Sequence, residues 1–191
     1  MSGGSTRRQV VAGLVLAALA GCSESPPATL YTLVPRPGLR IDRPVGPVAL
    51  RAVEIAKYLD RPQIVRHRTA VELAAADLDR WGEGLDTMVT RVLVENLSLR
   101  LPASQVTVAS SVVTPQAETL VAIDIARFDP DPDGTVVLEA RWTIRRGSSA
   151  GPVRLERIAA AAASSKSADL VATMSDCLAQ LSDRIAEAIA G

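Results

Sequence analysis

The sequence predicts a two-layer α/β sandwich, in which a mixed β-sheet carries two helices packed on one face. Two observations lead to this fold class. Residues 85–101 and 167–190 place apolar side chains at intervals of three and four, and the segments before and between them alternate between apolar and polar residues. A chain that runs through strands, a helix, more strands and a last helix favours a sheet with its helices on one side.

Each of the two predicted helices presents one continuous apolar stripe. The first begins near Leu85 and ends before Pro102, and Asp86 near its start suits the positive end of the helix dipole. The second runs from about Ser167 to Ala190, with Ser167 placed to cap its first turn. The stripes consist of Leu85, Met88, Val89, Val92, Leu93 and Leu97 in the first helix and of Leu170, Met174, Cys177, Leu178, Leu181, Ile185 and Ile189 in the second.

Short strands are expected on both sides of the first helix. Residues 48–55, 63–68 and 72–77 precede it, and a turn at residues 81–84 leads into it. A further strand at residues 106–109 follows the helix. These strands supply the part of the sheet that comes before the central hairpin.

A long hairpin is the clearest β-structure in the sequence. Residues 120–128 and 135–146 alternate on either side of the turn sequence 129–134, and another strand follows at residues 153–159. The turn reads Asp-Pro-Asp-Pro-Asp-Gly, which imitates half of a calcium loop, but its twelfth position is Ala140 and its flanks are strands. We therefore interpret it as a turn. The side chains expected to face the core are Val136, Leu138, Ala140, Trp142 and Ile144.

The N-terminus has the pattern of a bacterial lipoprotein signal. Arg7 and Arg8 precede an apolar run, and the small residues before Cys22 form a cleavage site. We expect residues 1–21 to be removed and the thiol of Cys22 to carry a diacylglycerol, with an N-acyl chain on its amino group. The paired arginines leave two export routes open, general secretion and the twin-arginine route, of which we favour the first.

The remaining chain suits one domain and a tether. Six prolines in residues 23–47 favour an extended segment, so we predict a tether over residues 22–47 and a single α/β domain over residues 48–191. Loss of the signal leaves 19 basic against 21 acidic residues, a formal net charge of −2. This balance gives no basic patch for nucleic acid, and we expect no nucleic-acid partner.

No set of residues typical of an enzyme or a cofactor site is present. The sequence has one histidine, His67, and lacks a nucleophile elbow, a phosphate loop and a dinucleotide fingerprint. Cys177 falls on the stripe of the last helix and is expected to be a buried filler. We therefore expect no catalytic residues, no metal and no cofactor apart from the acyl chains on Cys22.

One surface stretch has an unusual composition, and two interpretations of it stay open. It is either a tight turn with a local pair of Asp60 and Arg61, or a loop that recognises a protein partner, since tyrosine and arginine are enriched at interfaces. The stretch consists of Tyr58, Leu59, Asp60, Arg61, Pro62 and Gln63.

The same residues resemble the signature of a known family. Residues 58–65 are similar to the characteristic stretch of the ABC-type transport auxiliary lipoproteins of the PqiC/YmbA type. His67 departs from the pattern, which has arginine or a similar residue there. Supporting similarities are Tyr31-Thr32-Leu33, Trp81 with Leu85, Phe128-Asp129, and Leu138-Glu139-Ala140-Arg141-Trp142.

The resemblance implies a function in the cell envelope. It implies a periplasm-facing lipoprotein of the outer membrane whose partners are an MCE-domain protein and ABC or other inner-membrane transport components. Its implied task is to dock or anchor a bridge that carries lipid or another hydrophobic solute, with residues 58–63 as the partner-binding loop. Ser23, where aspartate would favour the inner membrane, agrees with this location.

Other functions and states are compatible with parts of the sequence. The alternative function is a lipid-binding carrier module of the envelope, and an envelope hydrolase is a third hypothesis that lacks its residues. A homo-oligomer is a further expectation, because a protein that docks on a symmetric assembly tends to share its symmetry.

Overall fold

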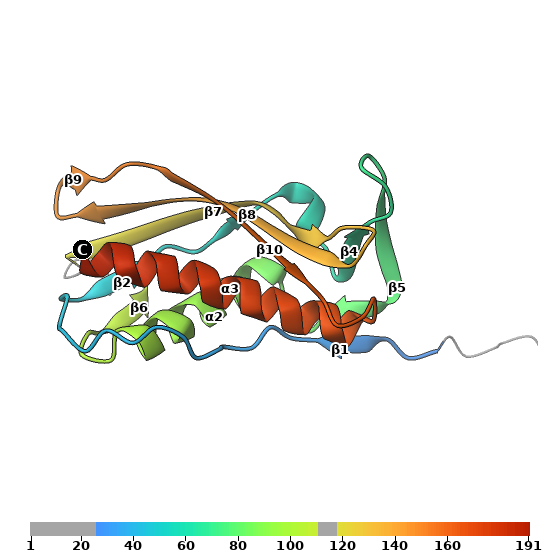
Figure 1. Cartoon of the computed structure of the whole chain (residues 1–191), viewed down its shortest axis with the longest axis horizontal. Coiled ribbons are helices and arrows are strands. Elements are labelled where there is room, and N and C mark those ends of the chain that lie inside the picture. The colour runs from blue at the N-terminus through green and yellow to red at the C-terminus, as the bar shows by residue number, and fades with distance from the viewer. Residues whose placement is uncertain (1–25, 111–117) are drawn as a thin grey trace, which may run out of the picture.

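The computed structural model describes residues 26–110 and 118–191, which form two β-sheets and two long helices (Figure 1). The predicted α/β sandwich is confirmed. The elements are β1 (Thr29–Tyr31), β2 (Val48–Leu50), β3 (Glu54–Ile55), the 3-10 turn η2 (Lys57–Leu59), β4 (Gln63–His67), β5 (Leu73–Trp81), α2 (Leu85–Arg100), β6 (Val106–Val108), β7 (Thr119–Pro130), β8 (Thr135–Arg146), β9 (Ser149–Ala150), β10 (Arg154–Ala161) and α3 (Ser167–Ala190).

The larger sheet is mixed. Its strands follow the order β10-β8-β7-β2-β6, while β3 pairs with β7 and β9 pairs with β8. The neighbours β7, β8 and β10 are antiparallel, whereas β2 runs parallel to both β6 and β7. Parallel neighbours need a crossover connection, and α2 lies in the one that joins β2 to β6. The five side chains of β8 that were expected to face the core are buried.

Helices α2 and α3 pack against each other and cover one face of this sheet (Figure 1). Every residue of the two predicted apolar stripes is buried, because the stripes face the sheet and the facing helix. The expected cap of α3 is wrong. Lys166 is the N-cap and makes no side-chain cap bond, while the hydroxyl of Ser167 donates to the carboxylate of Asp79 on β5.

A smaller sheet of three strands lies beside the first, in the order β1-β5-β4. Strand β5 is longer than the predicted segment of residues 72–77 and continues to Trp81. The extension has partners on both sides. Strand β1 runs parallel to it, with Tyr31 opposite Trp81, and the amide of Trp81 donates to the carbonyl of Pro62 at 2.7 Å. Pairing with β1 is long-range and leaves no local pattern in residues 77–81.

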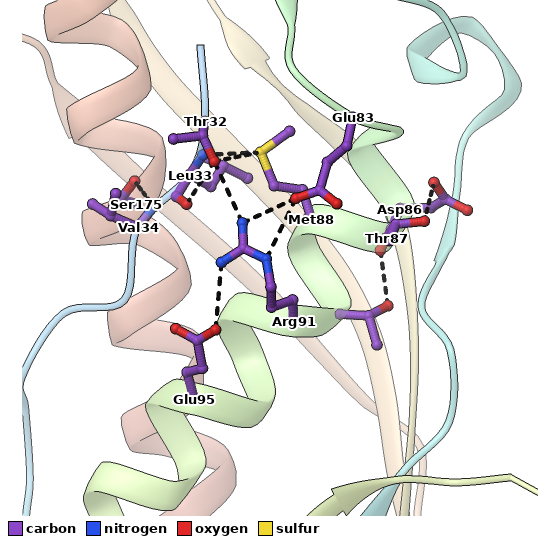
Figure 2. Close-up of polar contacts among 11 residues, drawn as sticks. Thr32, Leu33, Val34, Glu83, Asp86, Thr87, Met88, Arg91, Glu95 and Ser175 are labelled. Atoms are coloured by element: carbon purple, nitrogen blue, oxygen red, sulfur yellow. Dashed lines mark hydrogen bonds and ion pairs between the residues drawn. The ribbon is translucent and has the colours of Figure 1, made fainter.

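The segment before β2 differs from the predicted tether. Leu33 is buried, its amide lies 2.9 Å from the sulfur of Met88 on α2, and the amide of Val34 donates to the Ser175 hydroxyl of α3 at 3.2 Å (Figure 2). The apolar side chains between the prolines are therefore part of the core. Prolines keep this segment extended, as expected, but it lies on the helices, so the prediction of a free tether is wrong for residues 29–47.

A buried ion pair fixes the middle of this segment. The guanidinium of Arg100 is fully buried at the end of α2, and its Nε donates to Oδ1 of Asp183 on α3 at 2.7 Å. The same carboxylate oxygen accepts the amide of Leu39 at 2.9 Å, and Arg100 also donates to the carbonyl of Arg36 at 3.1 Å. A Cβ on Gly38 would lie 2.1 Å from Nη2 of Arg100, which requires glycine at this close approach.

Candidate functional site

The six-residue stretch predicted as a recognition loop lies between β3 and β4. Its first part is the single 3-10 turn η2, in which the amide of Leu59 donates to the carbonyl of Ala56 at 2.9 Å. The amide of Arg61 donates to the carbonyl of Leu59 at 2.8 Å, and Pro62 then leads into β4. Backbone bonds and proline thus give the loop one defined shape.

Two residues of the loop point inward. Leu59 is 2% exposed and belongs to the core, so it offers nothing to a partner. The hydroxyl of Tyr58 donates to Oδ2 of Asp129 at 2.5 Å, and Asp129 is fully buried. Leu59 and the hydroxyl of the half-buried Tyr58 thus hold the loop on the domain, and the contact role of Tyr58 stays a prediction.

Asp129 is the centre of a small polar cluster under the loop. Its Oδ1 accepts Nε of Arg127 at 3.0 Å and lies 3.3 Å from Nε2 of His67. Such partners are needed because a buried carboxylate without them is costly. Burial and the hydrogen bond to Asp129 raise the pKa of Tyr58 above its ordinary value. The departure from the family pattern at His67 thus falls on a half-buried residue of this cluster.

The other loop residues face solvent. Asp60, Arg61 and Pro62 are exposed, and Gln63 is the first residue of β4. Asp60 forms an ion pair with Lys57 at 3.0 Å rather than with its neighbour Arg61. Within residues 26–110 and 118–191, the guanidinium of Arg61 has no hydrogen-bond or ion-pair partner. The local Asp60–Arg61 pair of the simple-turn interpretation is therefore absent from the described residues.

An unpaired guanidinium beside a proline on a fixed backbone suits recognition of an acidic or carbonyl-rich surface. Arginine presents several donors in one plane and can bind a carboxylate through two parallel hydrogen bonds. Proline lowers the entropy that the loop loses when it is covered. The sequence was enough to identify the candidate loop, but it did not predict which residues of the loop would be exposed.

The acidic turn at residues 129–134 joins β7 to β8 and is a hairpin turn, as the sequence predicted. Asp131 pairs with Arg127 at 2.5 Å, and Oδ1 of Asp133 accepts the amide of Thr135 at 2.9 Å. Gly134 has a φ of +84°, a backbone conformation that glycine adopts without strain. No group of three metal-ligating side chains occurs in the part of the chain that the structure describes.

A second surface feature is an apolar groove beside α2. Its volume is about 410 Å³, and Ala52, Val94 and Val108 form its apolar wall. Arg91 stands at its rim between Glu83 and Glu95, at 3.0 and 3.4 Å (Figure 2). These carboxylates neutralise the guanidinium, and the hydrogen bond to Glu83 raises its pKa. The groove was not anticipated from the sequence, because it joins the outer face of a helix to an edge strand.

The two cysteines of the sequence, Cys22 and Cys177, differ in what the structure says of them. Cys22 lies outside the described residues, so its acylation stays a prediction. Cys177 is buried in α3, where burial raises the pKa of its thiol to about 12. In the segments 26–110 and 118–191, neither helix is long and apolar enough to cross a bilayer.

The geometry defines an α/β sandwich whose candidate site is an exposed surface loop rather than a cleft. The model of the family described as ABC-type transport auxiliary lipoprotein component matches residues 29–186, and the chain belongs to this family. The family is one of transport components and not a known enzyme family. The resemblance seen in the loop sequence is thus confirmed.

Solved structures share the fold. A protein described only as uncharacterized has a TM-score of 0.73 and 22% identity, with 86% of this chain and 99% of that chain covered. Protein XCC0632 from Xanthomonas campestris, assigned to the DUF330 family, has a TM-score of 0.69 and 18% identity, with 82% and 92% covered. At these identities the likeness concerns the fold alone. A search of the curated proteins found no match.

Proposed function

We propose that this chain is a membrane-anchored, periplasmic accessory lipoprotein of an ABC/MCE-type system that transports lipid or another hydrophobic solute. In this proposal it docks or anchors the transport bridge at the outer membrane, and it catalyses no reaction. Membership of the transport auxiliary family supports an envelope role. The MCE-domain partner, the outer membrane and the docking task go beyond the family description.

The observation that carries the docking role is the arrangement of the loop. Leu59 is buried and the hydroxyl of Tyr58 is bound to Asp129, whereas the next three residues are exposed, and the guanidinium of Arg61 at their centre has no partner among the described residues. These exposed residues belong to the stretch that resembles the family signature, which supports a contact role for them. We therefore assign the contact with the MCE-domain protein to Asp60, Arg61 and Pro62.

Co-purification tests this contact. The full acylated chain with Arg61→Ala is expected to retain clearly less of the MCE-domain protein than the parent chain, because truncated arginines at interface centres commonly cost about 2 kcal/mol or more. Arg43→Ala is the matched control, since Arg43 is also exposed and has no ion pair within the described residues. Equal losses for both variants, or no loss for either, would remove the loop from the interface.

The anchor is proposed on the signal alone. Small residues before Cys22 and a run too short to span a bilayer favour cleavage and acylation. Cys22→Ser should move the protein from the membrane fraction to the soluble fraction, because the acyl chains on Cys22 supply most of the attachment to the bilayer. Retention of Cys22→Ser in the membrane after a salt wash would contradict acylation as the means of attachment.

A lipid-binding carrier module is the second candidate function, and the apolar groove beside α2 is the observation that favours it. The interior between sheet and helices is filled by fully buried side chains such as Met88, Leu93 and Ile125, so a lipid would have to bind at the surface, where this groove offers an apolar wall. Native mass spectrometry of the purified protein separates the two functions. Bound lipid that is lost in Val94→Glu would favour the carrier.

A further inference from the structure

The hairpin of β4 and β5 projects from one end of the molecule (Figure 1). Its tip is residues 68–72, closed by a bond of 2.8 Å from the amide of Arg68 to the carbonyl of Glu72. The hydroxyl oxygen of Thr69 accepts the amide of Glu72 at 3.1 Å. These bonds give the tip a defined conformation.

The tip presents apolar side chains to solvent. Val71 is 96% exposed and Leu73 is 43% exposed. The charges beside them cancel, because Arg68 and Glu72 form an ion pair at 3.2 Å. Two apolar side chains beside a neutral pair, at a projecting tip, form a surface that suits an apolar, uncharged partner.

Both strands of the hairpin are fixed to the body. Ser167, the first residue of α3, donates to Asp79 of β5 and accepts from Arg66 of β4. The hairpin therefore extends from α3 as a supported arm, and the position of its tip follows the position of the domain.

Chain length brings this end close to the anchor. The docked segment begins at Thr29, so seven residue steps separate it from Cys22, a reach of at most about 25 Å. Thr29 lies opposite Asp79, and Leu73 at the start of β5 precedes Asp79 by six residues, which is about 20 Å of strand. Residues 26–28, which precede β1, lie at the end of the molecule from which the hairpin projects (Figure 1).

We propose that Val71 and Leu73 insert into the interface of the bilayer that holds the acyl chains of Cys22, so that the hairpin tip is a second membrane contact. This inference rests on the proposed acylation of Cys22. The short connection keeps the tip within reach of the lipid surface, and the similar lengths of connection and strand let the anchor and the tip meet one plane. A rigid arm and a short tether together hold the domain in one orientation.

The neutral tip also defines the kind of contact. Insertion of a valine and a leucine is driven by removal of apolar surface from water, with no net charge to recognise acidic headgroups. We therefore expect the same insertion in bilayers of phosphatidylcholine alone and in bilayers that also contain phosphatidylglycerol.

The test uses the full acylated protein reconstituted in vesicles. Val71→Cys is labelled with an environment-sensitive dye, and Val153→Cys is the matched control. Val153 is also an exposed valine, 67% exposed, and it follows β9 at the opposite end of the molecule (Figure 1). The buried thiol of Cys177 leaves the introduced cysteine as the reactive one.

The proposal expects a blue-shifted emission and several-fold stronger quenching by brominated lipid for the label at position 71 than for the label at position 153. A protein that floats with the vesicles while both labels behave as in water would overturn the second contact and leave the anchor intact. Failure of the protein to float would instead contradict the acylation. Shielding at position 71 that requires an added protein, or acidic lipid, also overturns the proposal.

Discussion

The hydroxyl of Tyr58 and the carboxylate of Asp129 are joined by a hydrogen bond of 2.5 Å across 71 residues of sequence. The bond connects the start of the exposed loop to the central hairpin of the larger sheet. It explains why a tyrosine stands in a surface loop: the ring holds the loop in place, and the residues after it are left to make contact.

Removal of the Tyr58 hydroxyl should weaken the domain without unfolding it. In Tyr58→Phe the buried carboxylate of Asp129 loses one donor but keeps Arg127, so we expect a loss of about 1–3 kcal/mol in the free energy of unfolding. Urea unfolding followed by circular dichroism measures this. Tyr31→Phe is the control, with an expected change below about 0.5 kcal/mol, because the Tyr31 hydroxyl has no hydrogen bond among the described residues. Equal losses would refute the role of the bond.

The hydrogen bond between Tyr58 and Asp129 also predicts that the stability of the domain falls at alkaline pH. The pKa of Tyr58 is raised above 10.0 in the folded protein, chiefly by burial, whereas in the unfolded chain it is ordinary. Stability from the protonated phenol is therefore fully present below pH 10.0 and is lost as the pH rises above that value. The stability difference between the parent and Tyr58→Phe should shrink across this window, and unfolding free energies at several pH values test it. A difference that grows with pH would contradict the assignment.

The ion pair of Arg100 and Asp183 should hold the N-terminal segment on the helices. Asp183→Ala leaves a buried guanidinium without its carboxylate, at a cost of about 2–3 kcal/mol once the partial exposure of Asp183 is considered. Hydrogen exchange at the amide of Leu39, which loses its acceptor, should accelerate. Asp176→Ala is the control, because its pair with Arg36 joins the same segment to α3 in solvent and should cost below about 1 kcal/mol. Unchanged exchange at Leu39 in Asp183→Ala would show that the segment is held by other contacts.

The thiol of Cys177 should be inert in the folded protein. Burial raises its pKa to about 12, so almost no thiolate is present near neutral pH, and the side chain is inaccessible. In the Cys22→Ser chain, a colorimetric thiol reagent at about pH 8 is expected to react only after urea is added. Rapid reaction without urea would mean that α3 opens locally.

Local sequence patterns were sufficient to predict the helices and the hairpin, because the apolar stripe of a helix such as α3 recurs in every turn along the sequence. The docking of residues 29–47 was not predictable from such patterns. Leu33 contacts Met88, and Leu39 contacts Asp183, so each contact joins distant parts of the chain. The prolines of this segment favour an extended backbone but do not determine which surface it packs against. The loop was found by its sequence, but the inward turn of Tyr58 depends on a partner that local spacing does not reveal.

The most direct test of the docking proposal is photocrosslinking in the living envelope. A photoreactive amino acid is placed at position 61 of the full acylated chain, with position 43 as the control, and the crosslinked products are identified by mass spectrometry. The proposal predicts that position 61 crosslinks to an MCE-domain protein and that position 43 does not. Absence of an MCE-domain protein from the products at position 61, in cells where the chain is anchored and folded, would contradict it.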